Sequence, residues 1–400
     1  MKILLSWLKD YIDIQETPEK IAEALNMTGL EVEEIIQPGK NLDQIVVGKI
    51  LSRDPHPDAD KLSLCSVDVN RGQPLQIVCG ASNMKAGDKV PVALIGAKLP
   101  GGFEISRAKI RGVESFGMMC SKKELGLSED HGGLYILEEQ TPIGENIVKA
   151  LDLDDVVFDI SITPNRGDAL SHLGIARELS AIFNLPLHRN PLGDEEGDDH
   201  VENHISVEIE DTTHCPRYGA RVIHGITVGP SPDWLKDRLE KVGLRSINNV
   251  VDITNYIMLD IGHPMHAFDL SKIAGNGILV RNARKDEKII TLDNIEHPLD
   301  SSMLVIADNS KPLALAGVMG GLLSSVSEKT TSVMLEAAFF NPTTVRKTAK
   351  RLGMMSDSSY RFERGTNIDN VPIALNEAAR LLRQIAGGRP VKGVADCYPK

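Results

Sequence analysis

Short runs of β-branched and apolar residues, separated by turn residues, fill the chain between residues 40 and 151. The runs cover residues 45–51, 62–69, 75–78 and 90–94, and Pro-Asp, Arg-Gly and Ala-Gly turns separate them. Short strands at regular spacing are typical of a small closed barrel. We therefore expect this segment to be all-β.

Helical patterns flank this segment on both sides. Residues 17–27 begin with Thr17 in the capping position and Pro18 at the first helical position, which are start signals of a helix. A second helical pattern covers residues 169–183. The clearest helix is predicted over residues 341–351, where an Asn-Pro pair supplies the N-cap and the first helical position.

These patterns predict a multidomain α+β chain. Residues 1–39 and 152–200 form a small split α/β domain, and the barrel of residues 40–151 is inserted into it. Strands and helices mix again over residues 205–400. Between residues 193 and 211 there are nine acidic side chains and no Lys or Arg. Because crowded like charges resist packing, this stretch is expected to be a solvated linker.

Length and composition exclude several classes of protein. The 400 residues, 42% apolar and 25% charged, suffice for two or three domains with cores. No apolar run approaches the ~18 residues of a membrane span. The five cysteines are scattered without a C-x-x-C pair, which argues against a disulfide framework or a zinc ribbon. We expect a cytoplasmic protein with reduced thiols and no membrane partner.

The net charge of −12 is distributed unevenly. Residues 1–39 and 152–211 together carry 6 basic and 23 acidic side chains, residues 40–151 carry 14 of each, and residues 212–400 carry 24 basic and 19 acidic ones. Binding of a polyanion depends on local charge. The last segment is therefore the part that can attract a phosphate backbone.

Glu336 is the only charge in the apolar run of residues 333–340. Period-two alternation puts it on one strand face with Met334, Ala338 and Phe340. A carboxylate in this position points either into a polar pocket or toward an exposed strand end, and the pattern alone favours the exposed end.

His263, His266 and Asp269 form an H-x-x-H-x-x-D run that a helix could present to a metal ion. Pro264 discourages a continuous helix, and no nearby cysteine or third histidine completes the set. We therefore favour locally satisfied histidines and expect no metal. There is also no phosphate-binding loop of the G-x-x-x-x-G-K type, and no Ser-His-Asp or Cys-His spacing indicates covalent catalysis.

Four ordered blocks give the barrel segment a family resemblance. They are Val46-Val-Gly-Lys-Ile, His56-Pro-Asp-Ala-Asp-Lys-Leu, Ile77-Val-Cys-Gly-Ala-Ser-Asn and Gly117-Met-Met-Cys-Ser. The segment resembles the tRNA-binding OB barrel of several synthetases. Such a barrel offers a curved face to RNA. Its basic side chains either meet phosphates or are ordinary surface charges.

Further blocks extend the resemblance over essentially all of the chain. They begin at Ile162 (ITPNRGDAL), Gly243 (GLRSINNVVDITNY), Gly262 (GHPMHAFD), Leu315 (LAGVMGG), Leu335 (LEAAFF) and Ser359 (SYRFERG). In this order they resemble the N-terminal half of the bacterial phenylalanyl-tRNA synthetase β subunit. The resemblance implies an OB-type barrel inserted into the split α/β domain, followed by a mixed α/β editing module, and further domains beyond Lys400.

This resemblance also implies a division of labour. Phenylalanine activation with ATP and Mg²⁺ takes place on an α subunit of an α2β2 heterotetramer, outside these residues, so no cofactor is expected here. The module of residues 205–400 hydrolyses tRNA(Phe) that carries tyrosine. A non-catalytic tRNA-binding or assembly scaffold is the alternative, and a metal-dependent hydrolase using the two histidines is another.

The family's site residues carry over position by position. The resemblance assigns His266 to positioning the ester or water, Glu336 to reading the tyrosine hydroxyl, and Ser356 to the catalytic set. It assigns these residues to substrate binding: Arg245, Thr254, His263, Gly317, Gly320 and Ser358. Ser358 departs from the family, where a methyl group is usual, which puts the selectivity of the pocket in doubt.

A basic track for the tRNA acceptor stem is the last assignment. Its residues are Arg346, Lys347, Lys350, Arg351, Arg361 and Arg364. A solvated helix face is the alternative for these charges. Arg245 could likewise be a surface residue, and the glycines could belong to a plain turn.

Overall fold

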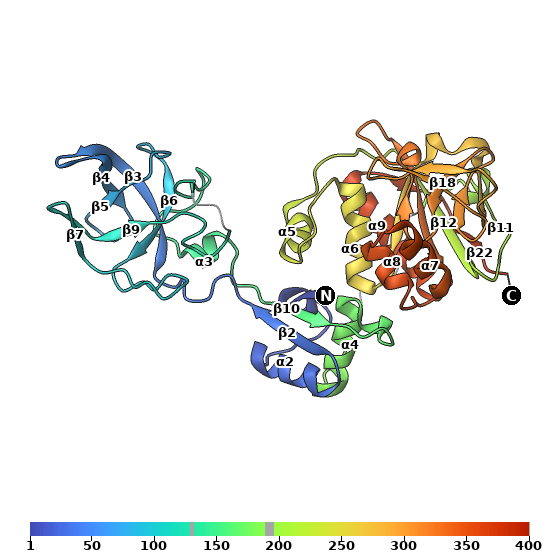
Figure 1. Ribbon diagram of the computed structural model, residues 1–400, viewed down its shortest axis with the longest axis horizontal. Helices are drawn as coiled ribbons and strands as arrows, with labels where there is room; N and C mark the ends of the chain where they lie inside the picture. The colour runs from blue at the N-terminus through green and yellow to red at the C-terminus, as the bar shows by residue number, and fades with distance from the viewer. Residues whose placement is uncertain (129–131, 189–195, 400) are drawn as a thin grey trace. The chain divides into compact units, whose positions relative to one another are not determined.

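The computed structural model describes residues 1–128, 132–188 and 196–399, a mixed α/β chain. They form two compact units, one of Ile36–Val156 and one of Met1–Ile35 together with Val157–Lys400 (Figure 1). The larger unit thus joins the terminal segment to the residues that follow Val157. No helix of the described residues is long and apolar enough to cross a membrane.

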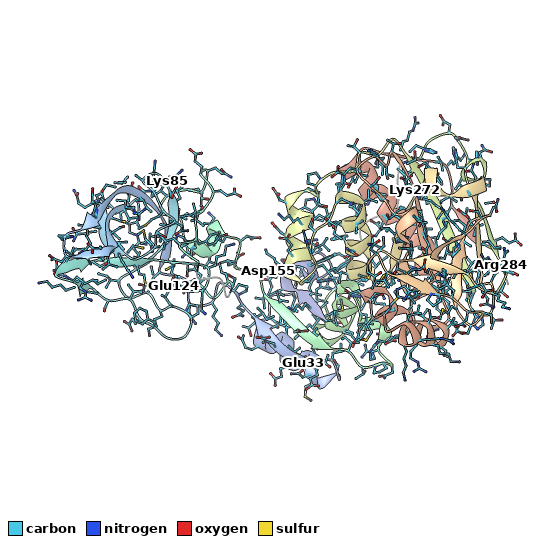
Figure 2. The ribbon with its side chains drawn as sticks, turned by 45° about the horizontal axis from the view of Figure 1, so that its top comes forward. Glu33, Lys85, Glu124, Asp155, Lys272 and Arg284 are labelled. Carbon is cyan, nitrogen blue, oxygen red and sulfur yellow. The ribbon has the colours of Figure 1, made fainter. Side chains whose placement is uncertain are left out.

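The unit Ile36–Val156 is built on a nearly closed, barrel-like antiparallel sheet. The order of its strands is β5 (Leu75–Cys79), β4 (Ala59–Asp68), β3 (Ile45–His56), β6 (Lys89–Leu94) and β9 (Gly117–Met119), with β7 (Ala108–Ile110), β8 (Val113–Ser115) and the helix α3 (Ile147–Ala150) beside it. Both faces of β3 are covered, because Val46 and Val47 belong to two different apolar clusters. Charged side chains such as Lys85 lie exposed at the surface (Figure 2).

All four predicted strands of this unit are confirmed, and two are longer than expected. β3 continues to His56 and β4 already begins at Ala59, because only the Pro-Asp turn separates the two strands. The predicted strand boundaries stopped where the β-branched residues end. The additional strand residues were not predicted because they are mostly polar and so do not extend the apolar runs.

A small three-stranded sheet opens the other unit. Its order is β1 (Lys2–Leu4), β10 (Val157–Ser161) and β2 (Glu31–Ile36), and it is accompanied by α1 (Leu5–Leu8), α2 (Pro18–Met27) and α4 (His172–Phe183). The predicted cap of α2 is confirmed, since the Thr17 hydroxyl accepts a hydrogen bond from the Lys20 amide. α4 begins later than predicted, because a 3₁₀ turn occupies Gly167–Ala169 and Ser171 caps the helix.

Two five-stranded sheets form the rest of this unit. The first has the order β13 (Met265–Asp269), β20 (Ser332–Phe339), β12 (Arg217–His224) and β21 (Arg389–Pro390), and β22 (Ala395–Cys397) also pairs with β12. The second has the order β11 (Ser206–Ile209), β14 (Gly277–Asn282), β17 (Leu304–Ala307), β18 (Pro312–Leu315) and β19 (Met319–Gly320). A separate hairpin joins β15 (Lys288–Ile290) to β16 (Glu296–Pro298). Arg284, which follows β14, lies exposed at the periphery (Figure 2).

Two long helices cover one face of the first sheet. The helices of this part are α5 (Asp233–Lys241), α6 (Asn249–Ile261), α7 (Pro342–Leu352), α8 (Asp357–Phe362) and α9 (Asn370–Ala386). α6 packs on β13, and α9 packs on β12 and β20 (Figure 1). The opposite face packs against the second sheet, because its residues Tyr218, Met334 and Phe268 share one apolar cluster with Val305 and Leu313. The central strand β20 is therefore buried on both faces.

The predicted acidic linker is wrong for the residues that the structure describes. Residues 193–195 lie outside the described part of the chain. From Val201 onward the chain forms a 3₁₀ turn and then β11, which pairs in parallel with β14. Ile205 and Ile209 are buried, whereas Glu208 is exposed. Glu208 occupies an outward position of this edge strand, and the acidic residues before and after the strand concealed its short alternation.

A buried carboxyl group ties the N-terminal segment to α6. Oδ1 of Asp260 accepts hydrogen bonds from the Trp7 indole at 2.8 Å and from the Tyr11 hydroxyl at 2.6 Å. Burial raises the pKa of Asp260 to about 6, although both hydrogen bonds oppose this rise. The folded state thus holds the proton more tightly than the unfolded chain does, and this contribution to stability is lost as the pH rises through 6.

The variant Tyr11→Phe tests this tie because it removes one donor and no carbon atom. Above pH 6 the charged carboxylate would lose a hydrogen bond, and we expect the free energy of unfolding to fall by ~1–3 kcal/mol. At pH 5 the carboxyl is protonated, so the loss should be smaller. Urea unfolding at pH 5 and pH 8 measures both values. Tyr398→Phe, at an exposed tyrosine, is the control; equal losses at both pH values would contradict the assignment.

Candidate active site

A pocket of about 360 Å³, including its open mouth, lies between the two sheets of the larger unit. Both sheets, the loop between β18 and β19, and α8 contribute to its wall. The lining residues are Pro264, Met265, His266, Ile306, Ala314, Leu315, Gly317, Val318, Met319, Gly320, Glu336, Ser358 and Phe362. The structure thus brings together five of the residues that the sequence predicts, namely His266, Gly317, Gly320, Glu336 and Ser358.

Glu336 and His266 are direct cross-strand partners on β20 and β13. Opposite residues of antiparallel strands point to the same face of the sheet, so both side chains enter the space between the sheets. Glu336 is only 6% exposed, and none of the hydrogen bonds among the described residues involves its carboxyl group. The expectation of an exposed strand end, favoured by the alternation pattern alone, is therefore wrong.

Burial raises the pKa of the Glu336 carboxyl to about 8. Among the described residues, no neighbouring cation or hydrogen-bond donor offsets the lost hydration. A buried carboxyl group that is left without a partner is typical of a site that waits for a ligand with a hydrogen-bond donor.

His266 is neutral at physiological pH, because burial lowers its pKa to about 4. Its ring lies edge-on to that of Phe268, with the two ring centroids 4.5 Å apart. Its Nε2 has no hydrogen-bond partner among the described residues. A neutral imidazole with an unengaged nitrogen can accept a hydrogen bond from a water molecule or donate one to a substrate.

Gly320 is required for His266 to occupy this position. A Cβ atom at residue 320 would lie 2.4 Å from Cε1 and 2.6 Å from Nε2 of the imidazole. Any side chain there would displace the ring or β19. The glycine, assigned above either to substrate binding or to a plain turn, acts here by making room for the histidine.

The structure corrects the assignment of Ser356 to the catalytic set. Its hydroxyl caps α8 by accepting a hydrogen bond from the Ser359 amide at 3.1 Å, and it donates to the Val318 carbonyl at 2.8 Å. The hydroxyl hydrogen is thus engaged by a main-chain carbonyl, and Ser356 is not among the residues that line the pocket. Ser356 holds α8 against the loop that carries Val318, and Ser358, two residues further on, reaches the pocket.

Three predicted substrate-binding residues do not line the pocket. The Thr254 hydroxyl donates to the Val251 carbonyl within α6 at 2.7 Å. Arg245 is exposed on the loop between α5 and α6. His263 is fully buried against the edge of Phe362, and burial lowers its pKa to about 4. Its ring lies behind the pocket wall, with its centroid 6.4 Å from that of the lining residue Phe362.

The predicted basic track is only partly exposed. Arg346, Lys347 and Lys350 are exposed on α7. Arg351, also exposed, pairs with Asp300 at 2.8 Å. Arg361 is 2% exposed and binds the Leu170 carbonyl and Asp357, so its assignment to tRNA binding is corrected to an internal tie.

Arg364 is also engaged within the protein. Its guanidinium stacks on the Tyr360 ring at 3.5 Å and pairs with Glu363. The exposed part of the track therefore consists of α7 alone. The cations of α7 lie on an exposed helix face, whereas Arg361 of α8 and Arg364 just beyond its end are engaged within the protein.

Sequence reasoning missed the apolar wall and one buried hydroxyl. Ile306, Ala314 and Leu315 of the second sheet face the pocket, and their only signal was membership of short apolar runs. Tyr218 pairs with Ala338, two residues from Glu336 on the same face. Its hydroxyl has no partner among the described residues, and burial, together with the Glu336 charge, raises its pKa.

The H-x-x-H-x-x-D run does not assemble as a group of metal ligands. Asp269 accepts hydrogen bonds from Thr330 at 2.7 Å and from Ser271 at 2.6 Å. In a strand, positions 266 and 269 point to opposite faces. Within the described ranges, no group of three or more His, Cys, Asp or Glu side chains could hold a metal ion.

The elevated pKa of Glu336 makes a prediction about stability. Between pH 4.5 and 8 the folded state binds a proton that the unfolded chain releases, so stability falls with rising pH by up to ~1.4 kcal/mol per pH unit. Glu336→Gln removes this titration. The variant should therefore exceed the wild type in free energy of unfolding at pH 9, and the difference should shrink at pH 6. Urea unfolding at both pH values measures it, and parallel pH dependences of the two proteins would refute the burial argument.

Comparison with known proteins identifies relatives over the whole chain. Residues 214–387 match the B3/4 domain family, and residues 45–146 match the tRNA binding domain family. The phenylalanine–tRNA ligase beta subunit of Syntrophotalea carbinolica is 48% identical over 400 residues, which are 100% of this chain and 50% of that protein. The subunit of the same name from Anaeromyxobacter dehalogenans is 50% identical over 400 residues, again 100% of this chain and 50% of that protein.

A solved structure shows a more distant similarity. An N-terminal fragment of the phenylalanyl-tRNA synthetase beta subunit from Pyrococcus horikoshii matches 60% of this chain and 63% of that chain, with 17% identity and a TM-score of 0.33. The chain spans about half the length of the curated relatives it matches. On the sequence identity over its full length, the chain belongs to the phenylalanine–tRNA ligase beta subunit family.

Proposed function

We propose that the pocket between the two sheets hydrolyses the ester of tRNA(Phe) that carries tyrosine. The observation that supports this editing reaction is the pairing of an unpartnered, buried carboxyl group with a neutral histidine in one pocket. The B3/4 match over the same residues is consistent with it.

The need for a second site follows from the similarity of the two amino acids. Tyrosine differs from phenylalanine by one hydroxyl group, and an apolar synthetic pocket discriminates weakly against a substrate that merely adds a hydroxyl. A site that instead offers a hydrogen-bond acceptor favours tyrosine, because phenylalanine leaves that acceptor desolvated and unpaired.

Glu336 fits the role of this acceptor. Its carboxyl group lies among apolar side chains and has no other partner in the described structure. The phenol of a bound tyrosyl group would donate to a carboxyl oxygen and so favour the ionised form. Binding would then lower the pKa of Glu336 from about 8 and release a proton near neutral pH.

Hydrolysis then requires only a held ester and an oriented water. His266 lies opposite Glu336 and, being neutral, can accept a hydrogen bond from the attacking water. The loop of Gly317 and Gly320 brings main-chain groups to the pocket, where an amide could stabilise the developing oxyanion. Ser356 is not needed as a nucleophile in this scheme, since its hydroxyl caps α8.

We further propose the context in which this site acts. The whole protein would charge tRNA(Phe) with phenylalanine together with an α subunit in an α2β2 assembly, with ATP and Mg²⁺ bound outside the present residues. The barrel-like sheet would be an OB-type tRNA-binding barrel inserted into a split α/β domain. The exposed cations Arg346, Lys347 and Lys350 on α7 would meet the acceptor stem.

A non-catalytic tRNA-binding scaffold remains the second candidate. The tRNA binding domain match favours it, because that match covers a separate unit from the pocket. The two functions separate in one assay: a scaffold binds tyrosyl-tRNA(Phe) and releases it intact, whereas an editing site releases free tyrosine.

Replacing Glu336 tests the reading of the phenol. Glu336→Ala should lower the preference for tyrosyl- over phenylalanyl-tRNA(Phe) in deacylation by ~10–100-fold, the equivalent of one lost hydrogen bond to a buried group. Glu328→Ala, at an exposed glutamate of the same unit, should leave the preference unchanged. Retention of the wild-type preference by Glu336→Ala would remove the proposed basis of selectivity.

The pH dependence of deacylation tests His266. In the Glu336→Gln background, which removes the other titration of the pocket, the His266-dependent part of the rate should stay level from pH 7.5 to 5.5. It should fall only near pH 4, where the buried imidazole gains its proton. The difference between this variant and the Glu336→Gln, His266→Ala double variant gives that part. Half-loss near pH 6.5 would indicate an exposed histidine instead.

A further inference from the structure

A chain of four hydrogen-bonded side chains lies at the start of β20, away from the pocket. Ser332 Oγ lies 2.9 Å from His224 Nδ1, His224 Nε2 lies 3.2 Å from His204 Nδ1, and His204 Nε2 lies 2.6 Å from Asp199 Oδ2. None of these residues lines the pocket described above. The candidate editing chemistry does not use them.

Regular structure fixes both imidazoles. His224 is the last residue of β12 and is the register partner of Ser332 at the start of β20. His204 follows directly after a 3₁₀ turn. The Asn203 amide donates to Asp199 at 2.7 Å, which holds the carboxylate behind His204.

The hydrogen bonds determine where the lone pairs lie. A carboxylate only accepts, so neutral His204 carries its proton on Nε2, toward Asp199. Its Nδ1 is then a bare lone pair aimed at His224 Nε2. Ser332 can donate to or accept from His224 Nδ1, so His224 is free to turn its own lone pair toward His204. In the other tautomer, His224 donates its Nε2–H to His204 Nδ1 and the contact is an ordinary hydrogen bond. A cation takes the place of that hydrogen when the His224 proton moves to Nδ1, toward Ser332, and both facing nitrogens then offer lone pairs.

The spacing of the two facing nitrogens suits a metal ion. Two nitrogen ligands at ~2.05 Å from a tetrahedral Zn²⁺ lie ~3.3 Å apart, close to the 3.2 Å found here. The ring centroids are 4.7 Å apart and the ring planes are inclined by 57°. Histidines that bind metals commonly donate their outer N–H to a carboxylate or another oxygen, as Asp199 and Ser332 permit.

We propose that His204 and His224 form a binding site for a borderline divalent transition-metal ion of the Zn²⁺ class. Asp199 and Ser332 orient the two ligands, and water completes the coordination. The site is open, since His204 is 22% exposed and no third His, Cys, Asp or Glu of the described chain joins it. A bound ion would fasten the segment around His204 to the end of the first sheet.

Calorimetric titration of the full chain, without an affinity tag, with ZnCl₂ at pH 7.5 tests the site. We expect one ion per chain, with an affinity at least tenfold weaker for His204→Ala and for His224→Ala. Asp199→Asn should weaken binding by ~10-fold or more, because the orienting partner is lost. His188→Ala is the matched control: His188 pairs with Asp13 at 3.1 Å and has no histidine as a partner, so its loss should leave the affinity unchanged.

Two measurements on the wild type guard against variants that do not fold. Zn²⁺ should raise the unfolding temperature, and Co²⁺ should produce the visible absorption bands of a nitrogen-ligated site. Both effects should weaken below pH 6, where protons compete for the imidazoles. Absence of saturable binding in the wild type, or wild-type affinity in both His204→Ala and His224→Ala, would overturn the proposal.

Discussion

The burial of one carboxyl group between two apolar sheets is the constraint on which the candidate site depends. β20 is the central strand, with α9 on one face and the second sheet on the other. Glu336 is therefore largely shielded from bulk water, and no cation of the described residues pairs with it. Such a group costs stability. The proposed recognition of a hydrogen-bond donor would offset that cost, because the ligand would supply the partner that the described residues lack.

The other parts of the pocket accommodate this group. Strand register sets His266 opposite Glu336, and Gly320 leaves room for the imidazole. The second sheet contributes the apolar wall, and α8 closes the pocket with Ser358 and Phe362. These elements come from distant parts of the chain, so the site exists only in the folded unit. No single sequence block contains it.

Sequence patterns over a few residues predicted the helices and strands, and which residues share a face of each strand. The strands of the barrel-like sheet, the capped helix after Thr17 and the alternation around Glu336 all follow from residue types within a few positions. Such patterns could not predict what packs on each face of β20, because α9 and the second sheet are distant from it in sequence. The family resemblance, rather than the pattern, indicated that Glu336 enters a pocket.

The remaining errors have similar causes. Ser356 and Arg361 have side chains that suit catalysis and RNA binding, but a helix cap and an internal carbonyl engage them. Residue type alone does not distinguish these uses.

The double engagement of the Ser356 hydroxyl has a consequence for how the pocket can vary among relatives. One oxygen joins the start of α8 to the loop that carries Val318, so the positions of the two walls are linked by hydrogen bonds. These two hydrogen bonds oppose a change in the width of the pocket that would move α8 away from this loop. Substitution at a lining position such as 358 alters the contents of the cavity without breaking this connection.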